Sequence, residues 1–184
     1  MDPSDERGIN MRRIAILMIG FVLVFLLGCQ TQRYIPSVSP VQLTPYQKML
    51  LAQIQRDGVQ VVKQGDHLQM ILPVDVFFQP QSTEIRYSKQ KALGVIAAFV
   101  KSYVQRVHGF PMVQVTGHSD IVFDPKTRMR LSREYAQVVA AYLWNHGIPQ
   151  SRLRVRGASS QQPIASDTTA AGNAMNRRVV IEVL

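Results

Sequence analysis

Cysteine, acidic residues and long apolar runs are all scarce in this sequence. Its 184 residues include one cysteine, so the chain can form no disulfide with itself. Asp and Glu number 12 against 21 Lys and Arg, which leaves a formal net charge of +9. The longest apolar run starts at Ile14 and has roughly fifteen residues, fewer than the ~20 that a permanent transmembrane helix needs. A disulfide scaffold and a helical membrane span are therefore excluded.

Motifs of catalysis and of metal or nucleotide binding are also missing. The sequence contains no HExxH, Walker A or GxGxxG motif, and its four histidines lack ligand spacing. His118, Ser119 and Asp120 are residue types of a catalytic triad, but neighbours on a strand point to alternate faces and cannot align. We therefore expect no enzymatic activity, no cofactor and no metal site.

The apolar run ends at the single cysteine, in Leu26-Leu27-Gly28-Cys29, and a basic pair precedes it. A basic start, a short apolar core and a cysteine are typical of a bacterial lipoprotein signal. The sequence thus predicts a signal peptide over residues 1–28, cleaved before Cys29, whose sulfur carries lipid. Because residues 1–10 are acidic, Met11 is the better translation start.

The part after the cleavage site divides into a linker and one domain. Residues 29–45 contain three prolines among Ser, Thr and Gln and predict a linker, whereas residues 46–184 suit one globular domain. Gln30 after the cysteine favours the outer membrane, with the domain in the periplasm. Residues 29–184 carry 18 Lys or Arg and 9 Asp or Glu. In that compartment a basic surface faces anionic cell wall, lipid headgroups or acidic proteins, and not nucleic acid.

Hydrophobic periodicity over residues 46–184 predicts alternating helices and strands in an α+β domain. Two long helices separated by strands give a strand–helix–strand–helix–strand order, and right-handed crossovers place both helices on one face of a mixed sheet. The expected helices cover residues 46–56, 88–108 and 125–145, and the expected strands cover 59–62, 68–72, 74–78 (continuing the sheet), 112–117, 153–156 and 179–184.

Both long helices are expected to end in the same way. His108-Gly109-Phe110-Pro111 and His146-Gly147-Ile148-Pro149 share the spacing His-Gly-apolar-Pro. Glycine adopts the left-handed cap, the next apolar residue packs back, and proline prevents further helix. Positive charge is favourable near a helix C-terminus, which explains the two histidines without a catalytic or metal-binding role.

Several motifs occur in the order and spacing of one family. They are Thr116-Gly117-His118-Ser119-Asp120, Leu131-Ser132-Arg133-Glu134-Tyr135-Ala136, Gly147-Ile148-Pro149, Leu153, Gly157 and Asn176-Arg177-Arg178-Val179. The region from about Val59 to Leu184 resembles the OmpA-like C-terminal domain, the peptidoglycan-associated module of Gram-negative envelopes. The resemblance implies a βαβαβ-type mixed sheet with helices on one face.

The resemblance also implies candidate peptidoglycan-binding residues. The family holds the wall peptide's ammonium with an aspartate, which matches Asp120, and its carboxylate with an arginine, whose position is taken by Tyr135. The family's asparagine at the helix start falls on Arg128, and its closing arginine matches Arg177. Arg128 lies seven residues before Tyr135, on nearly the same helix face, and either replaces the missing cation or is an ordinary surface arginine.

Two functions follow from this altered pocket. The chain also resembles the DotK/IcmN lipoprotein family of Dot/Icm type IVB secretion systems. In one hypothesis it is a structural component of such an envelope assembly, with other envelope or secretion-system proteins as partners. In the alternative, it is a peptidoglycan-binding anchor that tethers the outer membrane, through lipid at Cys29, to the cell wall.

Overall fold

The computed structural model describes residues 41–184. The signal peptide of residues 1–28, the start at Met11, the lipid site at Cys29 and most of the linker lie outside the described residues, and these stay predictions. Within the described part, no helix combines the length and the apolar character that a membrane crossing requires.

The elements follow the predicted alternation closely. They are α2 (Pro45–Arg56), β1 (Gln60–Gln64), β2 (His67–Pro73), α3 (Val74–Phe77), α4 (Tyr87–Val104), β3 (Val113–His118), α5 (Pro125–Asn145), a 3-10 turn (Gln150–Arg152), β4 (Leu153–Gly157), α6 (Ala170–Asn176) and β5 (Arg178–Val183). The short helix α6 carries no strong apolar period and was not predicted.

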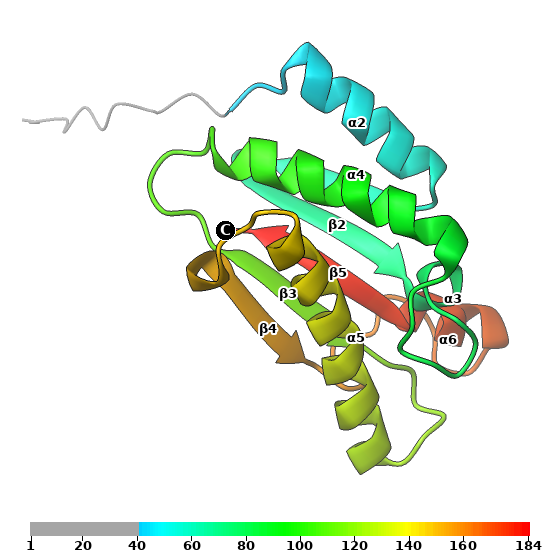
Figure 1. Cartoon of the computed structure of the whole chain (residues 1–184). Helices are drawn as coiled ribbons and strands as arrows, with labels where there is room; N and C mark the ends of the chain where they lie inside the picture. The colour runs from blue at the N-terminus through cyan, green and yellow to red at the C-terminus, as the bar shows by residue number, and fades with distance from the viewer. Residues whose placement is uncertain (1–40) are drawn as a thin grey trace, which may run out of the picture. The chain divides into compact units, whose positions relative to one another are not determined.

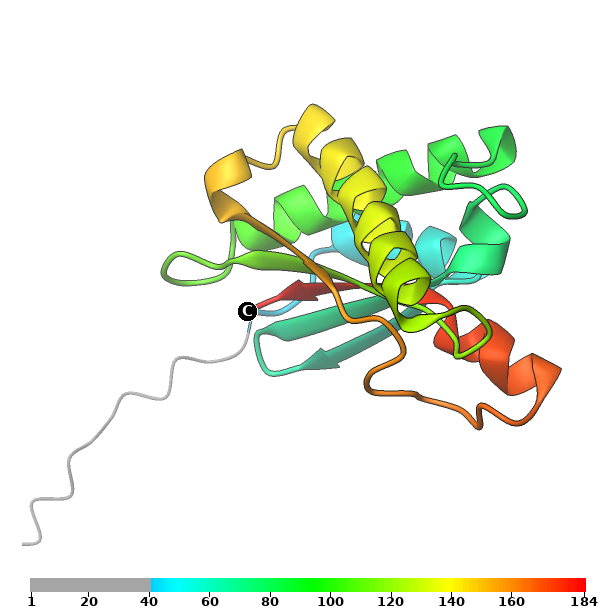
Figure 2. The same cartoon turned by 90° about the horizontal axis from the view of Figure 1, so that it is seen from below.

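The five strands form one mixed sheet in the order β1-β2-β5-β3-β4 (Figure 1). Antiparallel pairing joins β1 to β2, β2 to β5 and β5 to β3, whereas β3 and β4 are parallel. Helices α4 and α5 lie on the same side of the sheet, as Figure 2 also shows, and α2 packs against α4. The predicted α+β fold with helices on one face of a mixed sheet is confirmed.

Helix α5 begins and ends where the sequence predicts. The Asp124 carboxylate accepts hydrogen bonds from the N–H groups of Lys126 and Thr127, 3.0 and 3.1 Å away, and Pro125 starts the helix. At the other end Gly147 has a φ of +93°, and the Ile148 N–H donates to the Leu143 carbonyl. This pattern is the Schellman motif, so the predicted glycine cap is confirmed here.

Two predicted boundaries are wrong. Residues 74–78 do not continue the sheet: they form α3, because the Phe78 N–H turns back to the Val74 carbonyl (2.8 Å) and two residues three apart become buried together. Helix α4 ends at Val104 and not near His108. The N–H groups of both Arg106 and Val107 turn back to the Tyr103 carbonyl, which closes the helix before the glycine is reached.

Helix α5 sits unusually close to the sheet where β3 ends. A Cβ on Gly117 would lie 1.8 Å from the Ser132 carbonyl oxygen, so only glycine fits there. The Ser132 hydroxyl, fully buried, accepts the Ser159 N–H at 3.0 Å. This close contact fixes the start of α5, and with it the pocket described below.

The sheet has two distinct ends. At one end β3, β4 and β5 meet in the pairs Val113↔Leu153 and Val113↔Val183. At the other end Pro73 and His118 both pair with Arg178. Helix α3, the chain after β3 and the chain after α6 all lie at this second end, which is where the pocket forms.

Candidate functional site

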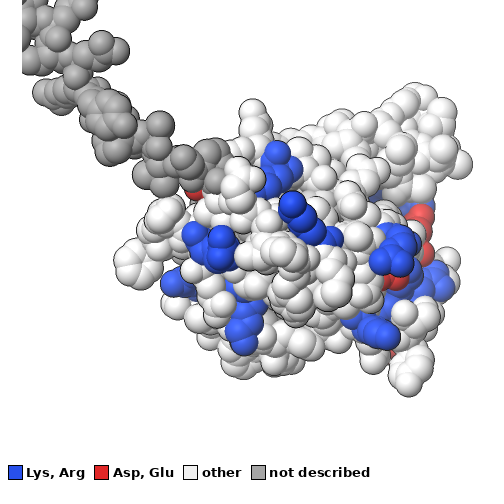
Figure 3. Space-filling view, turned by 90° about the horizontal axis from the view of Figure 1, so that it is seen from above, with Lys and Arg blue, Asp and Glu red and all other residues white. Residues whose placement is uncertain are grey.

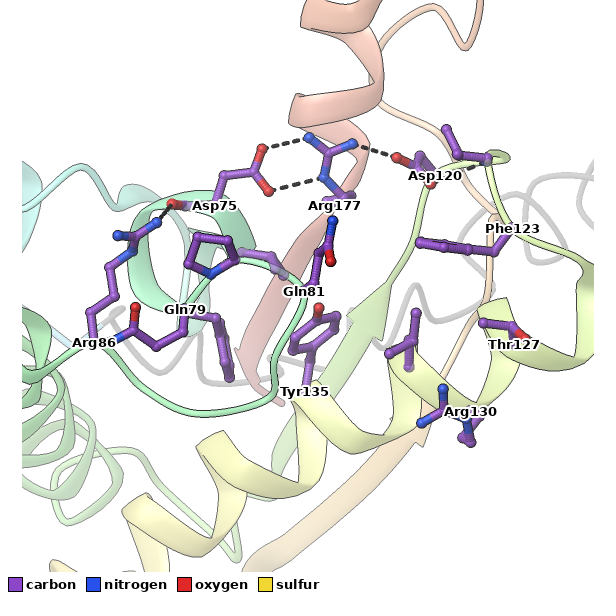
Figure 4. A pocket seen from close by; sticks show the side chains of 15 residues that line it. Asp75, Gln79, Gln81, Arg86, Asp120, Phe123, Thr127, Arg130, Tyr135 and Arg177 are labelled. Carbon is purple, nitrogen blue, oxygen red and sulfur yellow. Dashed lines mark hydrogen bonds and ion pairs between the residues drawn. The ribbon is translucent and has the colours of Figure 1, made fainter.

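A pocket of about 640 Å³ opens at the second end of the sheet. Figure 4 shows that its wall combines α3 and the following loop, the chain after β3, the first half of α5 and the residue after α6. The charged and aromatic residues that line it are Asp75, Phe78, Arg86, Asp120, Phe123, Arg130, Tyr135 and Arg177.

Arg177 joins two carboxylates at the centre of this pocket. Its Nε and Nη2 donate to the two oxygens of Asp75, at 2.9 and 2.5 Å, and its Nη1 donates to Asp120. The hydrogen bonds to Asp75 and then to Asp120 raise the pKa of Arg177, so its charge is permanent. Three of its five N–H groups are used, and the three side chains together carry one net negative charge.

Asp120 is the buried carboxylate of this ion-pair network. It is 2% exposed, two residues beyond the end of β3, and its Oδ1 accepts the Val122 N–H at 3.2 Å. A buried carboxylate needs a partner, and Arg177 supplies the opposite charge. The aspartate predicted to bind the ligand's ammonium is therefore already paired within the protein.

The segment before Arg177 is positioned by Asn176. The side chain of Asn176 is 1% exposed; its Oδ1 accepts the N–H groups of Ile164 and Ala165, and its Nδ2 donates to the Ala165 carbonyl and to Asp167. These four bonds fold residues 164–176 into a compact unit. Arg177 is consequently presented to the pocket by a rigid support.

Tyr135 forms the wall opposite this ion-pair network. Its ring meets Phe78 edge to face, with ring centroids 4.7 Å apart, and Figure 4 shows its hydroxyl pointing toward the Arg177 side of the pocket. Burial, and then the charge of Asp75, raise the pKa of Tyr135. The phenol is therefore neutral and can donate or accept a hydrogen bond, but it cannot supply the charge of an arginine.

The other two arginines in the lining also have partners in the chain. Arg86 donates from Nη2 to the Asp75 carbonyl at 3.2 Å. Arg130 donates from Nη1 to both oxygens of Glu134, at 3.0 and 2.9 Å. Each guanidinium near the pocket thus has a partner before any ligand arrives.

The structure brings together three of the four predicted peptidoglycan-binding candidates: Asp120, Tyr135 and Arg177. Arg128 is not among the pocket residues, since its Nη1 donates to the Ser160 hydroxyl at 3.0 Å. Seven residues separate it from Tyr135, which is about 10 Å along a helix, and its side chain crosses toward the loop after β4. The structure does not place Arg128 where it could replace the missing cation.

Asp75 is the pocket residue that sequence reasoning missed. The loop from Phe78 to Gln81 contains no acidic residue, and the carboxylate of this region comes from α3, three residues before Phe78. Its isolated position in an apolar stretch gave no local signal. Gln81, in the same loop, has a φ of +55°, a conformation uncommon for a residue with a side chain.

The pocket therefore suits a ligand that carries an amine. Asp75 and Asp120 keep free lone pairs for ammonium hydrogens, and the aromatic faces favour a cation nearby. At the centre of the pocket a ligand carboxylate would meet two carboxylates around Arg177, while Arg86 and Arg130 elsewhere in the lining already donate to the Asp75 carbonyl and to Glu134. In the part of the chain that the structure describes, no cluster of potential metal ligands occurs.

Comparison with known proteins identifies a matching family and several related lipoproteins. The model of the OmpA family matches residues 77–177. The chain is 35% identical to the probable lipoprotein YiaD of Escherichia coli over 124 residues, which are 67% of this chain and 54% of YiaD. It is 28% identical to the outer-membrane lipoprotein YfiB of Pseudomonas aeruginosa over 94% of this chain and 93% of YfiB. The chain thus spans about half of YiaD but nearly all of YfiB.

Among solved structures, the cell wall anchor of the T6SS from Pseudomonas aeruginosa is similar, with a TM-score of 0.62 and 30% identity over 74% of this chain and 94% of that one. The predicted location, an outer-membrane lipoprotein with its domain in the periplasm, is confirmed by the relatives. The family match covers more than half of the sequence and includes the pocket from Phe78 to Arg177. This chain belongs to the OmpA family.

Proposed function

We propose that this lipoprotein anchors the outer membrane, or an envelope assembly attached to it, to the cell wall by binding the peptide of peptidoglycan in the pocket around Arg177. The observation that carries the proposal is the Asp75–Arg177–Asp120 network at the base of the pocket. It offers a carboxylate surface to an amine in a cavity large enough for the end of a peptide. The role is binding and not catalysis.

The wall peptide supplies the group that this pocket needs. A diamino acid of the peptide presents an ammonium beside a carboxylate, and two carboxylates with one net negative charge recognise the ammonium. Tyr135 can only hydrogen-bond to the neighbouring carboxylate. We therefore expect this chain to bind a wall peptide with a free carboxylate more weakly than do relatives that have an arginine at this position.

Relatives support an anchoring role. The P. aeruginosa structure with 30% identity is named a cell wall anchor of a secretion system, and YfiB, which aligns over nearly its full length, is named an outer-membrane lipoprotein. An anchor with one end in lipid and the other on the wall uses both predicted parts of this chain. The lipid end, at Cys29, is a prediction from the sequence.

A second candidate function is that of a structural component of a secretion apparatus, here a Dot/Icm type IVB system, in which wall binding is secondary. The observation that favours it is Tyr135 together with the internal pairing of Arg86, Arg130 and Arg177. This arrangement weakens the binding of a zwitterionic ligand while it preserves the fold. The partners would then be other proteins of the envelope assembly.

Sedimentation with purified sacculi tests the first function. Residues 39–184 form one compact unit that carries the sheet, the helices and the pocket, so this segment is the protein to use. The double variant D75N/D120N removes both carboxylates at nearly constant shape. Because a hydrogen bond to a charged group contributes about 1.5–3 kcal/mol, we expect at least tenfold weaker binding to sacculi.

The matched control is E84Q, which removes an exposed carboxylate from the loop near the pocket but not from its lining. We expect E84Q to sediment like the unchanged domain. Tight sedimentation that survives D75N/D120N would refute binding in this pocket. No sedimentation by the unchanged domain would leave the structural role in a secretion assembly as the better account.

A further inference from the structure

The end of the sheet opposite the pocket carries an uncovered basic surface, made of Lys101, Arg106, Phe110 and Arg152. Phe110 is 88% exposed in the loop before β3, and the guanidinium carbon of Arg152 lies 5.9 Å from the centroid of its ring. Lys101 and Arg106 are exposed near the end of α4. An aromatic ring exposed to this degree, with cations around it, is a feature of a binding surface.

A second cavity, of about 390 Å³, lies within this surface. Lys101 and Arg152 line it, together with Gly109 from the loop after α4 and Gly147, which caps α5. A Cβ on Gly147 would lie 2.8 Å from the Lys101 ammonium, so the glycine leaves the space that this ammonium occupies. The cavity thus has two cations and no acidic residue in its lining.

The cations of this surface have no acidic neighbours along the nearby sequence. The sequence has no Asp or Glu from residue 101 to 119, nor from 135 to 166. The acidic groups at this end are Asp66, whose carboxylate accepts the Val41 N–H, Glu182, whose carboxylate accepts the side-chain amides of Gln69 and Gln114, and the C-terminal carboxylate, and none of them lines the cavity. In Figure 3 blue Lys and Arg side chains appear on both halves of the molecule, but most of the visible red lies among those at the right.

The described chain also enters the domain at this end. Val41 is buried and bonded to the turn between β1 and β2, beside the end of β5. A lipid anchor at Cys29 would therefore be joined to the domain at this end, while the pocket lies at the far end of a sheet about 20 Å long. The anionic surface nearest to the basic surface is then that of the lipid headgroups.

We propose that the basic surface docks on anionic phospholipids, with Lys101, Arg106 and Arg152 at the phosphates and the Phe110 ring inserted between headgroups. Apolar insertion and electrostatic attraction act together in such interfacial binding. Docking would hold the pocket end pointing away from the bilayer, toward the wall. This proposal concerns a surface remote from the pocket and does not depend on what the pocket binds.

Vesicle sedimentation with residues 39–184 tests the proposal. We expect binding to vesicles of phosphatidylcholine mixed with phosphatidylglycerol, little binding to phosphatidylcholine alone, and loss of binding at high salt. A lysine or arginine at an anionic surface contributes about fivefold in affinity, so K101Q/R106Q should bind about 25-fold more weakly. Within the described residues neither side chain makes a hydrogen bond or ion pair, so folding should be unaffected. The separate variant F110A should also bind more weakly.

The matched control is K91Q/K126Q, which removes the same charge from exposed positions near the starts of α4 and α5. We expect it to retain most of the binding. Equal losses in the two double variants would mean attraction by net charge alone and would overturn the proposal. So would absence of binding to the anionic vesicles, or capture by soluble polyglutamate with none by vesicles, which would assign the surface to an acidic protein.

Discussion

Arg177 and Asp120, 57 residues apart in the sequence, form an ion pair in which the carboxylate is almost completely buried. Asp75 completes the pair from a third segment, with both of its oxygens on the same guanidinium. In consequence, the pocket has carboxylates for an amine, whereas each arginine of its lining already donates a hydrogen bond within the chain. The selectivity of the site should therefore depend on the residue at position 135.

The variant Y135R should restore the missing cation. A new charge-assisted hydrogen bond to a ligand carboxylate is worth about 1.5–3 kcal/mol, so sedimentation with sacculi should strengthen by tenfold or more. Y135F is the control, since it keeps the ring against Phe78 and adds no charge. If Y135R and Y135F bind sacculi equally, the ligand carboxylate does not lie near this side chain.

Gly117 should tolerate no side chain. In G117A the new Cβ would meet the Ser132 carbonyl oxygen of α5 at 1.8 Å, so helix and sheet must separate. We expect a loss of at least about 3 kcal/mol in the free energy of unfolding, measured by urea denaturation. The control is G94A, within α4, where the nearest atom is His146 Nε2 at 3.9 Å. G94A should be neutral or stabilise by about 0.5–1 kcal/mol, and a similar cost for both variants would contradict the close contact.

Stability should fall on acidification because of His118. This residue is 3% exposed, and its Nδ1 lies 3.0 Å from the Gln161 carbonyl. Burial, and then the charge of Arg178, lower the pKa of His118 to about 4, below the value of about 6.5 expected in the unfolded chain. Above pH 6.5 neither state is protonated; below it, the unfolded state gains the proton first, so stability is lost between pH 6.5 and 4.

The variant H118Q isolates this effect. Between pH 7 and pH 5, His118 should lower the free energy of unfolding by about 2 kcal/mol. H118Q lacks this loss, so its melting temperature should drop less than that of the unchanged protein over the same pH range. H108Q, which changes an exposed histidine, should behave like the unchanged protein. An identical drop in H118Q and the unchanged protein would mean that other groups cause the acid sensitivity.

The variant C29S tests the lipid anchor, which lies outside the described residues. Serine offers no thioether, so the precursor should stay uncleaved and incorporate no labelled fatty acid. A single acyl chain gives only marginal binding, so several chains at one cysteine are needed for a stable hold on the membrane. Fatty-acid labelling of C29S equal to that of the unchanged protein would refute Cys29 as the lipid site.

Much of the fold could be predicted because its signals are local. Asp124-Pro125 and Gly147-Ile148-Pro149 determine the ends of α5 through hydrogen bonds within a few residues. The alternation of apolar residues likewise predicted both long helices and the strands between them. Where the signal was weaker, in residues 74–78, a helix replaced the expected strand: beyond Val74 the chain leaves the ladder with β5, and the Phe78 N–H turns back to the Val74 carbonyl.

The sequence alone thus determined the long helices and the five strands, their order, the absence of a disulfide and the residue types at the family positions, since these depend on neighbours along the chain. Only the tertiary structure decided the pocket. Asp75, Asp120 and Arg177 come from three segments that meet at one end of the sheet, and their charges are satisfied by one another. In the tertiary structure the Arg128 side chain also points toward Ser160 and away from the pocket. The direction and the ion pairing of a side chain depend on residues that are near in space but distant in the sequence. Local sequence patterns therefore do not predict them.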